Sequence, residues 1–230
     1  MSANNQTALL IGASRGLGLG LAREYLARGW RVVATARDDA SQLEALAKEA
    51  GDRLRIERAD IADPEDVTAL HDVLVNETLD LLFVVAGISG SVPKPLHAVS
   101  ADEAARVYLV NCYYPIAAAE ALIDRVNPGG VIAFMSSMLG SIAMNVSRAD
   151  WETYRTSKAA LNMASRSFFN RHPGHPVLSV SPGWVRTDMG GPAATFDVET
   201  SCRNVANAIA RHATAPGHRY VNYDGTELSW

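Results

Sequence analysis

Short apolar runs alternate with amphipathic segments along the whole chain. The segments between the runs carry apolar residues at helical spacing. This alternation predicts an α/β fold: one doubly wound, Rossmann-like parallel sheet of about seven strands, with helices on both faces and a ligand at the carboxyl ends of the strands. The expected strands are Thr7–Ile11, Arg31–Ala36, Arg53–Ala59, Leu79–Val85, Val131–Ser136, Val177–Ser181 and His218–Asn222.

Helix signals lie where this alternation requires them. A helical segment, Ala40–Ala50, is followed by Gly51, and Asp63-Pro64 places an N-cap residue before a proline at the first helical position. No internal repeat, low-complexity tract or linker divides the sequence. Residues 1–230 are therefore predicted to form a single domain.

Composition narrows the function classes. The chain has 230 residues, 48% of them hydrophobic, and a formal charge of −4 without any lysine or arginine run. Nucleic acid is therefore not an expected partner. No stretch is apolar enough to span a membrane, Met1–Gln6 does not resemble the start of a signal peptide, and Cys112 and Cys202 suit reduced thiols. The six histidines show no metal-ligand spacing, so we expect a cytoplasmic protein without a metal site.

The first expected strand runs directly into a glycine-rich turn, Gly12-Ala13-Ser14-Arg15-Gly16-Leu17-Gly18, and then into a helical stretch. Strand, glycine turn and helix form a typical phosphate-binding layout, because glycines let the backbone approach a pyrophosphate at the positive end of the helix. A tight turn between strand and helix is the structural alternative. Crowding of three glycines into one turn favours phosphate binding.

The same turn also fits the G-x-S-x-G nucleophile elbow of hydrolases, with Ser14 as the nucleophile. Only eleven residues precede Gly12, whereas such an elbow needs several earlier strands and an earlier loop for its oxyanion donors. The elbow also leaves Gly18 unexplained. The hydrolase interpretation is therefore disfavoured.

Tyr154 and Lys158 lie four positions apart, and so on one face of a predicted helix. A nearby ammonium group favours the phenolate and lowers the pKa of a tyrosine, which makes the phenol a better acid. The pair alone is weak evidence, since aromatic packing beside a solvated charge gives the same spacing. Further motifs in the chain strengthen it.

In order along the chain, those motifs resemble the short-chain dehydrogenase/reductase family, and the resemblance covers nearly the whole sequence. It is carried by the glycine turn, Asp60-Ile61, Ala86-Gly87, Asn111, the segment Ser136-Ser137-Met138-Leu139-Gly140, the Tyr154–Lys158 pair, and Pro182-Gly183-Trp184-Val185-Arg186-Thr187. Within the family the chain is most similar to C-factor-like and carbonyl-reductase-like members. It departs from the pattern at Val84-Val85, where most relatives have two asparagines.

The resemblance implies hydride transfer between a nicotinamide and a carbonyl or alcohol carbon. Tyr154 is then expected to donate the proton in reduction, Ser137 to hold the substrate oxygen, and Lys158 to lower the tyrosine pKa and bind the ribose. Asn111 is expected to position a water that links Lys158 to solvent. A capping or core hydrogen bond is the structural alternative for Ser137 and Asn111.

The resemblance also implies a set of residues that hold the cofactor. An acid in place of Ala36 would favour NAD(H), but that position is neutral and Arg37 follows it. Arg15 and Arg37 could together bind a 2′-phosphate, so NADP(H) is expected in preference to NAD(H). Asp38 is the one contrary sign, although this carboxylate is expected to cap the following helix. The expected cofactor contacts are Gly12, Ser14, Arg15, Gly16, Leu17, Gly18, Arg37, Asp60, Ile61, Ala86, Gly87, Tyr154, Lys158, Pro182, Gly183, Val185 and Thr187.

Apolar residues near the catalytic motifs predict an apolar or aromatic carbonyl substrate, although core packing explains such residues about as well. The function expected is an NADPH-dependent carbonyl reductase, a homo-oligomer (dimer or tetramer) with a monomer as the alternative. A nucleotide-binding signalling protein of the same fold is the competing hypothesis. The pocket candidates are Met138, Leu139, Trp151, Trp184 and Met189.

Overall fold

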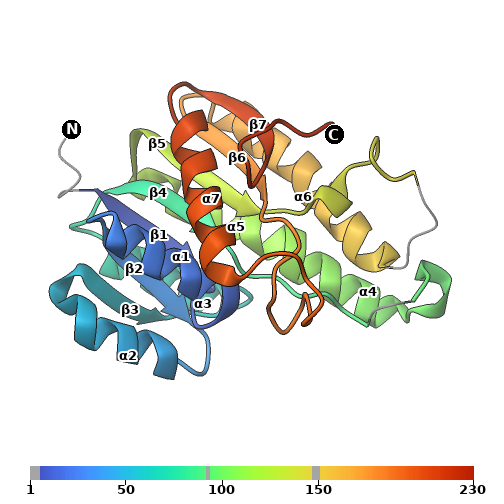
Figure 1. Cartoon of the computed structure of the whole chain (residues 1–230). Helices are drawn as coiled ribbons and strands as arrows, with labels where there is room; N and C mark the ends of the chain where they lie inside the picture. Colours follow the sequence, from blue (N-terminus) through green and yellow to red (C-terminus); the bar gives the residue numbers. More distant parts are fainter. Residues whose placement is uncertain (1–5, 92–93, 147–150) are drawn as a thin grey trace.

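The computed structural model describes residues 6–91, 94–146 and 151–230. Over these residues seven strands form one all-parallel sheet in the order β3-β2-β1-β4-β5-β6-β7 (Figure 1). This confirms the doubly wound parallel sheet expected from the sequence. The strands are β1 (Thr7–Ile11), β2 (Arg31–Ala36), β3 (Leu54–Arg58), β4 (Leu79–Val84), β5 (Val126–Met135), β6 (Pro176–Ser181) and β7 (Gly217–Asn222).

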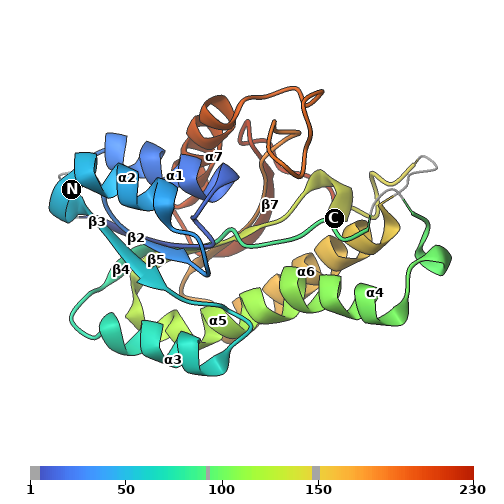
Figure 2. The same ribbon diagram turned by 90° about the horizontal axis from the view of Figure 1, so that it is seen from below.

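Helices cover both faces of the sheet. Figures 1 and 2 show α1, α2 and α7 on one face and α3, α4, α5 and α6 on the other. Asp63 caps α3 by accepting a hydrogen bond from the backbone N–H of Glu65 at 2.9 Å, with Pro64 at the first helical position, as expected. The helices are α1 (Gly16–Ala27), α2 (Ser41–Ala50), α3 (Pro64–Val73), α4 (Ala101–Tyr108), α5 (Tyr114–Leu122), α6 (Glu152–Arg171) and α7 (Val198–His212).

Strand β5 differs most from its expected range. It begins at Val126, five residues before the expected Val131, because Val126 pairs with Leu79 before the register shifts at Leu81. Gly129 has a φ of 77° within this irregularity. A bulge of this kind interrupts the apolar pattern, so hydrophobic periodicity could not reveal the start of the strand.

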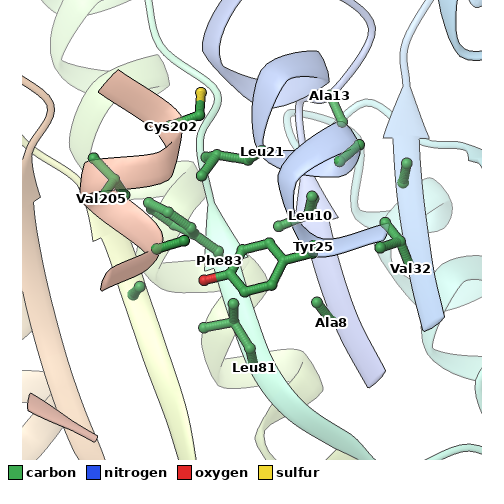
Figure 3. Packing of buried hydrophobic residues seen from close by; sticks show 14 of the residues in the cluster. Ala8, Leu10, Ala13, Leu21, Tyr25, Val32, Leu81, Phe83, Cys202 and Val205 are labelled. Carbon is green, nitrogen blue, oxygen red and sulfur yellow. The ribbon is translucent and has the colours of Figure 1, made fainter. Parts of the chain in front are cut away.

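Two apolar layers form the core, one on each face of the sheet. In the layer of Figure 3, Leu81 and Phe83 of β4 lie under Leu21 and Tyr25 of α1. Both cysteines are buried free thiols. Within the described part of the chain, no helix is long and apolar enough to cross a membrane.

Candidate active site

The chain reverses its direction of winding between β1 and β4, which are neighbours in the sheet. Such a switch point opens a ligand crevice at the carboxyl ends of the two strands. The backbone N–H groups of Val85 and Ala86 both donate to the carbonyl of Ile11, at 2.9 and 3.1 Å, and hold the two strand ends together. Gly12, with a φ of 86°, packs so closely here that an added Cβ would lie 2.8 Å from the Cβ of Ala86.

The glycine turn continues from this crevice into α1. A Cβ at Gly18 would lie 2.2 Å from the carbonyl oxygen of Gly12, so only glycine allows this approach of helix to strand. Arg15, the N-cap residue of α1, makes no side-chain cap, which leaves first-turn N–H groups available to an anion. Gly16 has a φ of 53°. Ser14 and Leu17 are half-buried in the same turn. These residues fit a dinucleotide pyrophosphate.

A Gly18→Ala substitution is expected to reduce stability by about 1–3 kcal/mol and to abolish cofactor binding, because the methyl group overlaps backbone that cannot move independently. Gly174→Ala is the matched control, since a Cβ there meets nothing within 4 Å and its φ is not positive. Thermal unfolding and cofactor titration check both variants. If Gly18→Ala binds the cofactor as tightly as the wild type, the glycine turn is not the pyrophosphate site.

Three of the expected catalytic side chains come together where β5 ends and α6 begins. Ser137 follows β5, and its hydroxyl hydrogen-bonds the phenol of Tyr154 on α6. The Lys158 ammonium lies over the face of the Tyr154 ring, 5.7 Å from its centroid, and donates to the carbonyl of Met135 at 2.8 Å. Tyr154 and Lys158 are both buried in the structure of the chain alone.

Burial dominates the proton affinities of this pair. It raises the pKa of Tyr154 to about 12, against the hydrogen bond from Ser137, which lowers it. Burial lowers the pKa of Lys158 to about 8. The structure of the chain alone therefore does not show the lowered tyrosine pKa expected from the sequence, because the ammonium faces the ring and the phenol is desolvated. At neutral pH the phenol carries its proton.

Asn111 lies in a π-helical turn, Leu109–Tyr113, between α4 and α5, and is fully buried. Its side-chain oxygen accepts from the N–H of Ile88 at 2.8 Å, and its amide donates to the carbonyl of Ile88 at 2.8 Å and the hydroxyl of Ser157 at 2.9 Å. These contacts tie the segment after β4 to α6. A Cβ at Gly87 would lie 3.2 Å from Asn111 Oδ1 and 3.3 Å from Lys158 Nζ, so the three residues lie close together after the carboxyl end of β4.

At the end of β2, Ala36 is buried and Arg37 is exposed. Arg37 Nε lies 2.6 Å from a carboxylate oxygen of Asp38. The expectation that Asp38 caps the following helix is wrong, because its carboxylate accepts a hydrogen bond from Arg37. The N–H of Ser41, at the start of that helix, donates instead to Asp39 at 2.9 Å. Arg58, which ends the adjacent β3 and which the sequence did not single out, donates to the carbonyl of Asp38 at 2.8 Å.

Arg15 pairs with Asp188, at 3.4 Å, from the loop that follows β6. A Cβ at Gly16 would lie 3.6 Å from a methyl carbon of Thr187, so this loop passes next to the glycine turn. It contains the expected contacts Pro182, Gly183, Val185 and Thr187, and bridges Val185 to Phe196. After β3, the side chain of Asp60 accepts from the N–H of Ala62 at 2.9 Å, and Ile61 packs against the core.

Of the five expected pocket residues, Trp151 contacts the catalytic group through Tyr154. Trp151 has a φ of 78°, the only positive value of a non-glycine residue in the described part of the chain, and packs edge-to-face on Tyr154 with 5.9 Å between centroids. Trp184 donates its indole N–H to the carbonyl of Gly190 at 2.8 Å. Met138, Trp184 and Met189 are exposed, and Leu139 is half-buried.

Among residues 6–91, 94–146 and 151–230, no cluster of three or more His, Cys, Asp or Glu side chains could hold a metal ion. The sequence did not reveal the hydrogen bonds that hold the site segments in place. The N–H of Ile88 donates to Asn111, the N–H of Gly12 to Thr35, and the hydroxyl of Ser136 to Asn162. These contacts join segments far apart in the chain. No spacing rule could have found them.

Comparison with known proteins identifies the family of this chain. The family model described as short chain dehydrogenase matches residues 6–197. The C-signal of Myxococcus xanthus is 35% identical over 156 residues, which are 66% of this chain and 93% of that protein.

Two solved structures cover almost the entire chain. A protein of Burkholderia multivorans with bound NADP has a TM-score of 0.94 and 41% identity, over 98% of this chain and 99% of that one. A carbonyl reductase of Pseudomonas aeruginosa PAO1 in complex with NADP has a TM-score of 0.90 and 38% identity, with the same coverage. The chain therefore belongs to the short-chain dehydrogenase/reductase family and is an NAD(P)-dependent oxidoreductase of that type.

Proposed function

We propose that this oxidoreductase is an NADPH-dependent reductase of aldehydes or ketones. The observation that carries the proposal is the buried pair Tyr154 and Lys158, with Ser137 bonded to the phenol, together with a glycine turn in which Gly12 and Gly18 leave no room for a side chain. Burying an ammonium and a phenol together is costly for packing alone. The carbonyl reductase of Pseudomonas aeruginosa supports the reaction class, because it has the same fold at 38% identity.

The cofactor would be held by the glycine turn at its pyrophosphate and by Lys158 and Tyr154 at its nicotinamide ribose. It would supply the hydride that reduces the carbonyl carbon. Asp60, Ile61, Ala86 and Gly87 would line the adenine side of the crevice, and Pro182, Gly183, Val185 and Thr187 the nicotinamide side.

Tyr154 would give its phenolic proton to the carbonyl oxygen as negative charge develops there. Ser137 would hold the same oxygen by a hydrogen bond and so orient the carbonyl group toward Tyr154. Lys158 would stabilise the phenolate left behind, and Asn111 would position the water that returns a proton through Lys158. The raised pKa of Tyr154 suits an acid that must remain protonated until the substrate arrives.

Rates of carbonyl reduction are expected to fall as pH rises through about 8, the pKa to which burial lowers Lys158. Below that value the ammonium is charged and stabilises the phenolate; above it the amine is neutral and that stabilisation is lost, while Tyr154 itself stays protonated. A pH profile of kcat at saturating NADPH measures this. A profile that stays flat to about pH 10 would contradict a role for the Lys158 charge.

NADPH is the proposed cofactor because Arg37 and Arg15 carry exposed guanidinium groups near the adenosine end of the crevice, and Arg58 adds a third beside Arg37. Relatives from Burkholderia multivorans and Pseudomonas aeruginosa were solved with NADP. Trp151, Met138, Leu139, Trp184 and Met189 would form an apolar substrate pocket, which favours aromatic or aliphatic carbonyl compounds.

A screen of aldehydes, ketones and alcohols against NADPH and NADH, followed by nicotinamide absorbance, tests the proposal. Turnover of apolar carbonyl compounds with NADPH supports it. The alternative, a regulatory nucleotide-binding protein, is favoured by the similarity to the C-signal of Myxococcus xanthus. Tight NADPH binding without turnover of any carbonyl or alcohol would favour that alternative.

A further inference from the structure

The C-terminal segment folds back over β7 and packs by aromatic stacking. Leu228 donates its N–H to the carbonyl of Tyr220 at 2.8 Å. The ring of Trp230 stacks on Tyr220 at 5.2 Å and on His218 at 4.7 Å between centroids. Arg166 of α6 lies over the Trp230 ring at 5.4 Å. These contacts fix the position of the chain end against both β7 and α6.

The same segment contacts the loop that carries Ser137. The hydroxyl of Ser141 donates to the carbonyl of Ser229 at 2.7 Å, and the N–H of Ala143 donates to the carbonyl of Trp230 at 2.9 Å. The loop from Ser137 to Ala143 is therefore bound at its far end by residues almost ninety positions later in the chain.

Tyr220 binds the near end of the same loop. Its hydroxyl donates to the backbone carbonyl of Ser137, and the side chains of Asn162 and Ser136 also interact with that hydroxyl. Tyr220 is 1% exposed, so it cannot reach a substrate. Its hydrogen bond nevertheless ends on the residue whose own hydroxyl touches Tyr154.

We propose that Tyr220 and Trp230 are positioning residues, which hold Ser137 at the distance and angle needed beside Tyr154. The inference rests on the proposed reductase function. Tyr220 fixes the backbone of Ser137 directly, and Trp230 fixes it through the stack on Tyr220 and through Ala143. A displacement of the order of 1 Å at a catalytic group can cost about a hundredfold in rate, so a looser Ser137 should slow the chemical step.

Tyr220→Phe is the most direct test, because it keeps the ring and its stack and removes only the hydroxyl. The expected result is a fall in kcat of about tenfold with an unchanged KM for NADPH. Tyr25→Phe is the matched control. Tyr25 is equally buried, lies in the core near α7 (Figure 3), and its hydroxyl has no hydrogen-bond partner among the described residues. We expect wild-type kcat in that variant.

Trp230 is tested by two substitutions. Trp230→Ala removes the stack and is expected to lower kcat to a similar extent, whereas Trp230→Phe keeps an aromatic ring on Tyr220 and should restore most of the activity. Melting temperatures of all variants are measured in parallel. The contrary result is that kcat falls only in proportion to the melting temperature and falls equally in Trp230→Ala and Trp230→Phe. Trp230 would then stabilise the fold without positioning Ser137.

Hydrogen exchange supplies a readout that does not depend on turnover. The N–H groups of Leu139, Gly140 and Ala143 are bonded to Ser137 or Trp230. Faster exchange confined to a peptide spanning residues 137–144 is expected in Tyr220→Phe and Trp230→Ala, and not in Tyr25→Phe. If the wild type turns over no carbonyl compound, the proposed function fails while this exchange pattern still supports positioning of the loop. Unchanged exchange together with unchanged kcat would overturn the inference.

Discussion

Tyr154→Phe is expected to lower turnover by about 10²–10⁴-fold while NADPH affinity stays nearly constant. The hydroxyl acts on the oxygen that gains charge in the transition state, so its loss affects kcat rather than cofactor binding. The phenylalanine ring can keep the edge-to-face contact with Trp151 and the position under Lys158. Steady-state kinetics and NADPH titration measure the two effects separately.

Lys158→Ala is expected to damage both turnover and cofactor binding. The substitution removes the ammonium that would bind the ribose, and it leaves the carbonyl of Met135 without its donor. Lys48→Ala on the exposed face of α2 is a matched control and should leave both parameters unchanged. Near-normal turnover in Tyr154→Phe would show that another group donates the proton. Equal loss of cofactor binding in Tyr154→Phe and Lys158→Ala would show that their roles are divided differently.

The sheet could be predicted from the sequence because β1, β4 and β6 bury nearly continuous runs between two helical layers, whereas the edge strands β3 and β7 are buried at only some of their positions. Six of the seven strands begin within one residue of their expected start. β5 is the exception, since the register shift and Gly129-Gly130 interrupt its pattern. Periodicity detects continuous burial, and it has no means of detecting a bulged strand.

The site could be predicted in part, because glycines and the Tyr154–Lys158 pair have fixed local spacings. Hydrogen bonds such as Tyr220 to Ser137 join segments 83 positions apart and leave no local pattern. The pKa of Tyr154 also depends on burial, which no spacing reveals. Local geometry is therefore readable in the sequence, whereas the environment of each group requires the fold.

Arg37→Ala is expected to weaken NADPH binding by about 1.5–3 kcal/mol, the cost of a charge-assisted hydrogen bond, and to leave NADH binding almost unchanged. In the structure Arg37 is paired with Asp38 and Arg15 with Asp188, and all four side chains are exposed. Exposed pairs of this kind contribute about 0–1 kcal/mol, so each guanidinium can exchange its carboxylate for a 2′-phosphate at low cost.

Arg15→Ala should narrow the preference for NADPH in the same way, and the double variant should lose less than the sum of the single losses, because both groups would contact one phosphate. Arg31→Ala is the control, since Arg31 is exposed on the same strand, β2, but at its opposite end. Titration of each variant with both cofactors gives the four affinities required. Equal losses for NADPH and NADH would assign the arginines to folding or to general attraction of phosphate. A wild-type preference for NADH would overturn the proposed cofactor, because a neutral Ala36 followed by Arg37 would then have failed to select the phosphorylated ribose.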